Sequence, residues 1–502
     1  MITMITMKTV LDVLIIGAGI SGIGMAAHLR DKCPNASFKI IERRTNIGGT
    51  WDLFKYPGIR SDSDMSTFGF NFKPWRESKV LADGASICNY LQETVAEKQL
   101  ANHIEFDQEV LEANYDSNTK LWKVITKHKS TEKQQTYTAR FFVGCTGYYN
   151  YSEGYTPQYK DQDVFKGQFI HPQHWPEDLD YRNKKIIVIG SGATAITLVP
   201  SLVKGGAGHV TMLQRSPSYI ASIPSSDIIH KKLSQYVSLE TAYQFTRLKN
   251  VALQRTSYAL SKRFPKAMRF ALLKSVEMQV GKNVDMKHFT PSYNPWDQRL
   301  CVVPDGDLFK AFKSGEASIE TDHIERFVEQ GILLKSGKIL EADIIVSATG
   351  LALQMLGGMQ VKLDNQPFVP SEHMLYKAVL PNDLPNAALM IGYINSSWTL
   401  KVDLAADYVC RLLKYMNEKG YDEVVAQADP SLLAEDTVLG SMSSGYIQRA
   451  ADIIPRQGKT YPWIVTHNYL KDRKILKTAQ FDDPILKFSK KTTQQVQLKM
   501  IS

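Results

Sequence analysis

The sequence predicts an α/β protein with two doubly wound sheets, each opened by a strand, a glycine turn and a helix, and a helical insertion. Two glycine-rich turns lie 173 residues apart, and a short β-branched run precedes each: Val13–Ile16 and Ile186–Ile189. A buried strand closed by glycine and followed by a helical pattern begins a β-α-β unit. At 502 residues the chain is long enough for two or three domains. We therefore expect two Rossmann-like dinucleotide-binding domains.

The first unit is expected to contain a strand over Lys8–Ile16, a helix over Ser21–Leu29 and a strand over Phe38–Ile41. Its turn has the spacing Gly17-x-Gly19-x-x-Gly22, in which the glycines permit a tight turn, approach of a pyrophosphate and close helix packing. Glu42, 25 residues past Gly17, is suited to two free ribose hydroxyls. The structural alternatives are a plain strand–helix turn and, for Glu42, a surface salt bridge.

The second unit has Gly190, Gly192 and Ala195 in the three turn positions, with Thr194 beside them. Here the residue 25 places past the first glycine is Arg215, and Ser216 follows it. A guanidinium offers a planar fork to a 2′-phosphate, so this unit is predicted to bind NADPH. In the alternative, Arg215 only covers the sheet edge and the preference shifts toward NADH. The two units thus predict two different dinucleotides and a redox enzyme.

The remaining segments complete the expected organisation. Residues 48–75 are rich in glycine, proline, tryptophan and aspartate and predict a functional loop. Helical spacing over residues 217–295 predicts the insertion, and Asp403–Lys419 predicts an amphipathic helix closed by Gly420. Strands followed by glycine turns at 141–147 and 346–350 mark the crossings between domains. The expected domains are 1–150 with 349–502, 151–216 with 316–348, and the insertion 217–315.

Composition excludes several classes of protein. The net charge of +9 is modest for this length, and no basic stripe with interleaved aromatics predicts nucleic-acid binding. Five scattered cysteines without a C-x-x-C favour a reducing cytoplasm and argue against a disulfide framework, a zinc site or a dithiol redox pair; no metal site is expected. No stretch predicts a transmembrane span, and Met1–Met7 lacks the pattern of a signal peptide. The basic tail Lys487–Lys499 is expected to fray. Apolar helical patches in 217–295 leave peripheral membrane association open, and oligomeric state is not predicted.

Two longer motifs identify a family. The first, Phe165-x-Gly167-x-x-x-His171-x-x-x-Trp175, stands just before the second glycine turn, and the second runs from Gly48-Gly49-x-Trp51 through Tyr56-Pro57-Gly58 to Asp62. Both resemble, at every fixed position, the motifs of class B flavoprotein monooxygenases of the Baeyer–Villiger type (type I). The stretches Arg60–Asp64 and Tyr293–Arg299 are similar to the ethionamide-activating subgroup. Trp175 favours this chemistry over the related flavin N-oxygenases, whose motif tends to end in Tyr or Phe.

The resemblance implies cofactors and a reaction. FAD is expected in the domain built from both chain ends, NADPH in the middle domain, and substrate where the domains meet. NADPH reduces FAD, and the reduced flavin captures O₂ as a C4a-peroxide that attacks a carbonyl. The expected products are an ester or lactone from a ketone, and water. Oxidation of thioether or thioamide sulfur is the expected side activity.

The resemblance also assigns residues. Arg299 is the expected catalytic cation and Asp62 its carboxylate partner, with Gln298 standing where many members have lysine. Gly49, Trp51, Tyr56 and Asp62 are expected around the flavin, and Trp398 near the nicotinamide ribose and substrate. Phe165, Gly167, His171 and Trp175 are expected to form an interdomain hinge rather than a general base. The alternatives are a structural salt bridge for Arg299, a loop N-cap for Asp62 and simple core or helix-cap packing for the aromatics.

Three rival functions remain on the sequence alone. The nearest rival is a flavin N- or S-oxygenase without ketone activity. A pyridine-nucleotide disulfide reductase shares the two-dinucleotide layout but needs a cysteine pair close in sequence. A nucleotide-sensing or structural redox protein would bind both dinucleotides without consuming oxygen.

Overall fold

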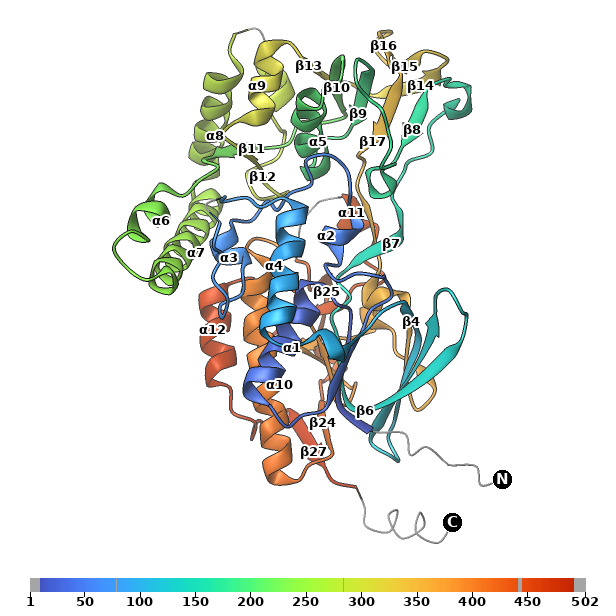
Figure 1. The fold of residues 1–502 in the computed structure, drawn as a ribbon, viewed down its shortest axis with the longest axis vertical. Coiled ribbons are helices and arrows are strands. Elements are labelled where there is room, and N and C mark those ends of the chain that lie inside the picture. The colour runs from blue at the N-terminus through green and yellow to red at the C-terminus, as the bar shows by residue number, and fades with distance from the viewer. Residues whose placement is uncertain (1–9, 78, 283, 441–444, 492–502) are drawn as a thin grey trace.

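The computed structural model describes residues 10–491 except 78, 283 and 441–444, so the calls on Met1–Met7 and on the tail beyond Lys491 lie outside the described residues. Two sheets lie one above the other along the long axis of the molecule, with the first glycine turn in the lower part and the second in the upper part (Figure 1). The predicted α/β class with two dinucleotide-binding units is confirmed.

The lower sheet has nine strands in the order β20-β19-β4-β5-β6-β1-β2-β3, with β23 also paired to β6. Strand β1 lies between β2 and β6, parallel to both, and its residues from Val13 to Ile16 are almost fully buried. Strands β4, β5 and β6 form an antiparallel extension. The strands are β1 (Val10–Ile16), β2 (Phe38–Ile41), β3 (Ile104–Glu105), β4 (Gln108–Asp116), β5 (Leu121–His128), β6 (Gln134–Gly144), β19 (Gln360–Leu363), β20 (Gln366–Pro367) and β23 (Ala387–Leu389).

Helices cover one face of this sheet (Figure 1). Helix α1 is buried on nearly all sides, since it lies between the sheet and the helices α4 and α10. It begins one residue earlier and ends three residues later than predicted. Helix α10 ends at Lys419 with Gly420 in the left-handed conformation, as predicted, but it begins at Trp398 rather than at Asp403. The helices are α1 (Ile20–Lys32), α4 (Gly84–Glu97), α10 (Trp398–Lys419) and α12 (Tyr469–Thr478).

The upper sheet has five parallel strands in the order β13-β10-β9-β17-β8. Helices α5 and α9 pack on it, and a three-stranded antiparallel sheet adjoins it. These elements are β8 (Gln168–Ile170), β9 (Lys185–Ile189), α5 (Ala193–Lys204), β10 (His209–Gln214), α9 (Asp307–Ser314), β13 (Ala317–Thr321), β14 (Ile324–Val328), β15 (Gly331–Leu334), β16 (Ile339–Glu341) and β17 (Ile344–Ser347).

The insertion projects from the side of the molecule (Figure 1). It contains α6 (Ile228–Leu233), α7 (Leu239–Arg263) and α8 (Pro265–Val280), flanked by the parallel pair β11 (Ile220–Ile223) and β12 (Cys301–Pro304). The segment 217–315 therefore holds two strands as well as helices. The exact domain boundaries stay a prediction.

Arg247 of α7 fixes the insertion to the lower half. Its side chain is buried, and Nη1 donates to the carbonyl oxygens of Ser66, Thr67 and Gly69 at 3.0, 3.2 and 2.7 Å. Nη2 donates to Oδ2 of Asp403 in α10 at 3.3 Å. Asp403 also accepts from the N–H of Asn71 at 2.8 Å. Because both charges are removed from water, each helps to compensate the other.

Two strands connect the halves: β7 (Tyr149–Gly154) and β18 (Leu351–Leu353) run antiparallel to each other after the predicted crossing turns. The loop 48–75 contains only the one-turn helices α2 (Thr50–Leu53) and α3 (Met65–Phe68). The expectation that the basic tail frays is wrong for Lys487–Ser489. These residues belong to the last strand, β27, which pairs with β24. The other short elements are β21 (Leu375–Tyr376), β22 (Leu380–Pro381), β24 (Glu423–Ala426), β25 (Leu433–Thr437), α11 (Gly445–Gln448), β26 (Arg456–Gly458), β27 (Leu486–Ser489) and seven 3₁₀ turns at Ala101–His103, Gln162–Val164, Pro172–His174, Met286–Phe289, Met355–Gly358, Pro370–Glu372 and Pro430–Leu432.

None of the helices in the described part of the chain combines the length and apolarity that a bilayer span requires.

Candidate functional site

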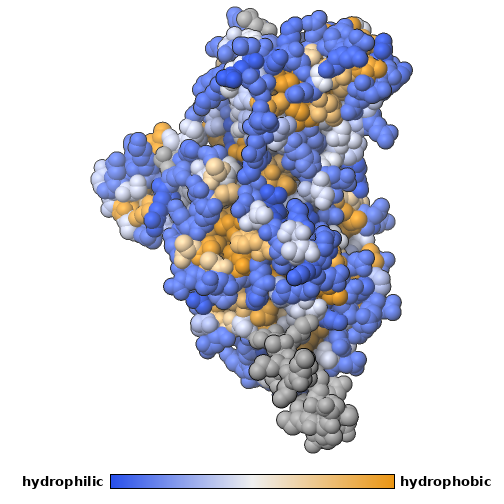
Figure 2. Space-filling view, turned by 45° about the vertical axis from the view of Figure 1, so that its right-hand side comes forward, coloured by the Kyte–Doolittle hydropathy of each residue, from blue (hydrophilic) through white to orange (hydrophobic). Residues whose placement is uncertain are grey.

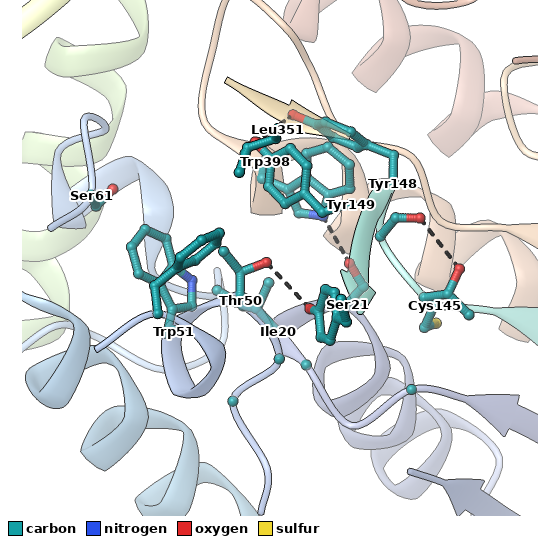
Figure 3. A pocket seen from close by; sticks show the side chains of 18 of the residues that line it. Ile20, Ser21, Thr50, Trp51, Ser61, Cys145, Tyr148, Tyr149, Leu351 and Trp398 are labelled. Atoms are coloured by element: carbon teal, nitrogen blue, oxygen red, sulfur yellow. Dashed lines mark hydrogen bonds between the residues drawn. The ribbon is translucent and has the colours of Figure 1, made fainter. Parts of the chain in front are cut away.

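A cavity of about 290 Å³ opens between the two halves of the molecule (Figure 3). Its walls come from the first glycine turn, the loop 48–63, strand β7 and the first turn of α5. The structure thus brings together ten of the predicted site residues: Gly17, Gly19, Glu42, Gly49, Trp51, Tyr56, Asp62, Thr194, Arg299 and Trp398.

The first glycine turn leads into the cavity. Gly17 has φ +105°, and a Cβ on Gly22 would lie 1.8 Å from the carbonyl oxygen of Gly17, so the helix packs as closely as predicted. Gly22 itself is buried beneath the turn. Gly19 is the N-cap of α1 and provides no side-chain cap, and its backbone approaches Gly49 of the neighbouring loop. The first N–H groups of α1 therefore lie at the cavity wall, where a helix N-terminus favours an anion.

Glu42 follows β2 directly and lies beside this turn. Its Oε2 accepts a hydrogen bond from the backbone N–H of Ala18 at 2.7 Å, and Oε1 accepts one from the N–H of Arg44 at 2.9 Å. Burial raises the pKa of this carboxyl, while the two N–H groups and the nearby arginines oppose the increase. These contacts hold the carboxylate at the carboxyl edge of the sheet, where the motif predicts a ribose acceptor.

Arg299 and Asp62 form an ion pair within the cavity wall. The guanidinium Nη2 lies 2.9 Å from Oδ1 and 2.8 Å from Oδ2 of Asp62, although 237 residues separate the two in sequence. The exposed fractions of the two side chains are 36% and 27%, so both remain accessible from the cavity. Nearby, Arg60 donates to Asp307 at the start of α9 at 2.7 Å. Two ion pairs thus join the loop 48–63 to the upper half.

The same loop packs on the second glycine unit. The ring of Tyr56 is buried, and its hydroxyl lies beside the hydroxyls of Thr194 and Thr197 in α5. Burial raises the pKa of Tyr56 against the opposing effect of these hydroxyls. Trp51 contacts the edge of Phe68, with ring centroids 5.6 Å apart. Both aromatics therefore line the cavity from the predicted flavin loop.

Trp398 closes another side of the cavity. Its indole Nε1 donates to Oγ of Ser21, in the first turn of α1, at 2.8 Å, and its ring lies 5.3 Å from that of Tyr148 (Figure 3). Tyr148 in turn packs against Tyr149 at 4.5 Å. Trp398 is the first residue of α10, so its side chain links the last part of the chain to the first glycine turn.

Sequence reasoning missed Arg43, Tyr148 and the tyrosines of β7. Tyr148, Tyr149 and Tyr151 all line the cavity, and the guanidinium of Arg43 stacks over the ring of Tyr151 at 4.9 Å. The available signal was the cluster Tyr148-Tyr149-Asn150-Tyr151 directly after the turn at Gly147.

The second glycine turn lies at the upper rim. Gly190 and Gly192 are outside the cavity lining, and Ala195 is fully buried, whereas Thr194 lines the cavity. No atom lies within 4 Å of a Cβ built on Gly192, so the N-terminus of α5 is open. Arg215 and Ser216 follow β10 and are exposed; Oγ of Ser191 donates to the carbonyl oxygen of Ser216 at 3.0 Å. The structure thus places Arg215 beside the turn, separate from the cavity.

The residues of the Phe165–Trp175 motif lie away from the cavity, around β8. Phe165 is buried against Phe327, and a Cβ on Gly167 would lie 2.3 Å from the carbonyl oxygen of Asp343. The ring of His171 packs on Gly154 at the end of β7, and Nδ1 accepts from the N–H of Gln173 at 3.2 Å. Burial lowers the pKa of His171.

Trp175 packs edge-on against Tyr181, with ring centroids 6.3 Å apart. The contact between His171 and the crossing strand agrees with a hinge position; the hinge role stays a prediction.

A buried polar network, also missed from the sequence, supports Tyr393 in the cavity wall. The Tyr393 hydroxyl donates to Oδ2 of Asp472 at 2.8 Å, and Nζ of Lys401 lies 3.0 Å from the same oxygen. Thr466 donates to Oδ1 at 2.6 Å. Burial lowers the pKa of Lys401, and Asp472 opposes this. The network joins α10 to α12 behind the cavity.

The buried side chain of His467, next to this network, is expected to make the stability of the fold sensitive to acid. Burial lowers its pKa to about 4, so the unfolded chain, with a pKa near 6.5, binds a proton more readily than the folded one. Stability therefore falls as pH decreases from about 6.5 toward 4. Between pH 7 and pH 5 we expect the protonation of His467 to lower the free energy of unfolding by about 2 kcal/mol. Urea unfolding of wild type, His467→Gln and the exposed control His323→Gln at both pH values measures this; equal pH dependence in all three would contradict it.

Among the described residues, no group of three or more His, Cys, Asp or Glu side chains is arranged to hold a metal ion.

Comparisons with known proteins agree with this geometry. Residues 11–429 match the family model described as flavin-binding monooxygenase-like. A relative named probable FAD-binding monooxygenase AlmA, from Acinetobacter sp, is 62% identical over 97% of this chain and 98% of its own length. FAD-containing monooxygenase EthA of Mycobacterium tuberculosis is 47% identical over 96% of this chain and 98% of its own. An oxidized steroid monooxygenase bound to NADP, 20% identical, shares the fold with a TM-score of 0.76 over 96% of this chain and 100% of that one. The chain belongs to the flavin-binding monooxygenase-like family.

Proposed function

We propose that this protein is an FAD- and NADPH-dependent Baeyer–Villiger monooxygenase, which inserts one atom of O₂ beside a ketone carbonyl to give an ester or lactone. The other oxygen atom leaves as water, and oxidation of thioether or thioamide sulfur is the proposed side activity. The observation that carries the proposal is the Arg299–Asp62 pair in a cavity shared by the first glycine turn and α5. The five cysteines of the chain are free thiols, which fits a reducing cytoplasm as its location.

The residues of the lower half fit FAD. The N-terminus of α1 is suited to the pyrophosphate, and Glu42 is suited to the ribose hydroxyls. Trp51 and the loop 48–63 line the space beyond the turn. The relatives named as FAD-binding and FAD-containing monooxygenases support this cofactor.

The residues of the upper half fit NADPH. The N-terminus of α5 is open, and Thr194 faces the cavity at its first turn. Arg215 and Ser216 are exposed beside the turn, where they can reach a 2′-phosphate. A dinucleotide bound here extends toward the cavity that the flavin shares.

In this arrangement the chain supplies charge and orientation. When bound, FAD reduced by NADPH supplies the activated oxygen. Arg299 holds a permanent positive charge in the cavity, where it stabilises negative charge that develops on oxygen. Asp62 orients the guanidinium through both carboxylate oxygens. Trp398 and the β7 tyrosines provide an apolar wall that limits access of water.

The test uses the purified FAD-loaded enzyme with NADPH, a simple cyclic ketone and ¹⁸O₂. We expect lactone containing one labelled oxygen, and NADPH consumption that increases with ketone. Oxidation of a thioether without lactone would instead support the alternative, a flavin N- or S-oxygenase without ketone activity. Absence of both products would reject the proposal.

The Arg215 assignment predicts a change in cofactor preference. We expect Arg215→Gln to lower kcat/KM for NADPH about 10- to 100-fold, because a charge-assisted hydrogen bond contributes about 1.5–3 kcal/mol. The value for NADH should remain within about twofold. Steady-state oxidation of both nucleotides measures this, with the exposed Arg473→Gln as control. If the ratio of kcat/KM for NADPH to that for NADH did not change, Arg215 would only cover the edge of the sheet.

A further inference from the structure

Exposed apolar side chains concentrate on the insertion. Of the 18 large apolar side chains that are exposed in the described part of the chain, 11 lie between residues 228 and 278. Several are exposed by more than half, including Tyr236 at 84% and Phe270 at 71%. The set is Ile228, Ile229, Tyr236, Val237, Phe245, Leu248, Leu253, Leu260, Phe264, Phe270 and Met278. Exposed apolar side chains gathered in one projecting segment point to a site of interaction.

Helix α7 exposes apolar side chains to solvent in addition to the residues that attach it to the rest of the molecule. Its inner face buries the apolar side chains of Tyr243 and Val251. The same face carries the buried polar side chains of Arg247 and Asn250, which bind the lower half of the molecule. Its outer face exposes Phe245 and Leu248 to solvent. Because the inner face already attaches this helix, the apolar side chains on its outer face bury no surface on folding.

Basic residues surround this surface. Residues 227–280 contain ten Lys and Arg against three Asp and Glu, so this segment holds +7 of the chain's net charge of +9. Lys231, Lys232 and Lys266 are exposed beside the apolar residues. In Figure 2 orange and blue residues alternate on the projecting lobe at the left, which lies at the level of α6 and α7.

We propose that the helices α6–α8 dock on the surface of an anionic lipid bilayer. Apolar side chains enter the headgroup boundary and the surrounding lysines bind the acidic headgroups, which is the physical pattern of an interfacial helix. A second copy of this chain is disfavoured as the partner, because face-to-face contact would bring +7 against +7. The same helix contacts the cavity wall, since Oε1 of Gln254 accepts from the hydroxyl of Ser396 at 2.9 Å. Docking therefore places the membrane one helix away from the candidate site.

The test is flotation of the full-length FAD-loaded protein with vesicles. Vesicles of phosphatidylcholine alone are compared with vesicles in which about one lipid in three is the anionic phosphatidylglycerol. We expect binding to the anionic vesicles, weaker binding to the neutral ones, and release at high salt because screening weakens the headgroup contacts.

Two variants separate the contributions. In Lys231→Gln/Lys232→Gln/Lys266→Gln we expect the partition coefficient to fall about a hundredfold, since each basic residue contributes about fivefold. In Phe245→Ser/Phe270→Ser binding should fall on both kinds of vesicle. Lys129→Gln/Lys133→Gln, exposed on the β5–β6 hairpin, and Ile339→Ser, exposed on β16, are the matched controls and should bind like wild type. Flavin content and circular dichroism confirm that each variant is folded.

Failure of wild type to float with anionic vesicles would overturn the proposal, as would equal binding of the variants. Sedimentation velocity gives the remaining outcome. A dimer that the Phe245/Phe270 variant converts to monomer, without vesicle binding by wild type, would assign this surface to contact between copies and also overturn the proposal.

Discussion

Replacing Arg299 with alanine is expected to lower ester formation at least about a hundredfold, whereas NADPH still reduces the flavin. Arg299 is the cation that Asp62 holds in the cavity wall through both carboxylate oxygens. Its removal leaves the glycine turns and the N-termini of α1 and α5 intact, so nucleotide binding should persist. The charge that stabilises developing negative charge on oxygen is lost, and the effect falls on the oxygen-transfer half of the cycle.

Rapid mixing with NADPH, followed by product analysis with ketone, separates the two halves of the cycle. Arg299→Lys keeps the charge but loses the guanidinium that Asp62 orients, so it should recover part of the activity. Asp62→Asn retains the guanidinium and should be less damaging than Arg299→Ala. Arg76→Ala, an exposed arginine elsewhere, is the control. Ester yield from Arg299→Ala equal to that of wild type would remove Arg299 from the mechanism.

The largest stability effect is expected at Arg247, which anchors α7. Arg247→Met removes the guanidinium beside the buried Asp403 carboxylate and the donor to the carbonyl oxygens of Ser66, Thr67 and Gly69. Loss of one member of a buried ion pair costs about 3–5 kcal/mol, and we expect that decrease in the free energy of unfolding. Urea unfolding followed by circular dichroism measures it.

The matched control is Arg255→Met, an exposed arginine on the same helix, which should change stability by less than about 0.5 kcal/mol. The double variant Arg247→Met/Asp403→Asn should be less destabilised than the sum of the single variants, because it no longer leaves a charge unpaired. A decrease below about 1 kcal/mol for Arg247→Met would show that the hydrogen bonds and the ion pair do not anchor the insertion.

Helices and strands that depend on residues close together in the sequence were predicted well. The first strand, helix and second strand lie within a few residues of their predicted bounds, because β-branched runs and glycine turns act over short distances. Helix α10 was predicted to begin five residues late, since Lys401 interrupts the apolar pattern in its first turn. That lysine is buried only because Asp472, 71 residues further on, compensates its charge. No local pattern reports such a partner.

The tail shows the same limit. Lys487 and its neighbours were expected to fray on account of their charge, yet Phe488 pairs with Val424 in a strand whose partner lies more than 60 residues away. Backbone pairing and burial of alternate side chains outweigh the local excess of lysine. The site divides in a similar way: the motifs identified Trp51, Tyr56 and Trp398, whereas the network behind Tyr393 required the fold.

The sequence by itself determined the two glycine turns, the different charges that follow them and the family to which the chain belongs, because each depends on residues close together along the chain. Only the tertiary structure decided which distant side chains meet, such as Arg247 with Asp403. It also decided that Phe245 and Leu248 of α7 face solvent rather than the core. A hydrophobic pattern shows that a helix has an apolar face, but what covers that face depends on how the rest of the chain packs.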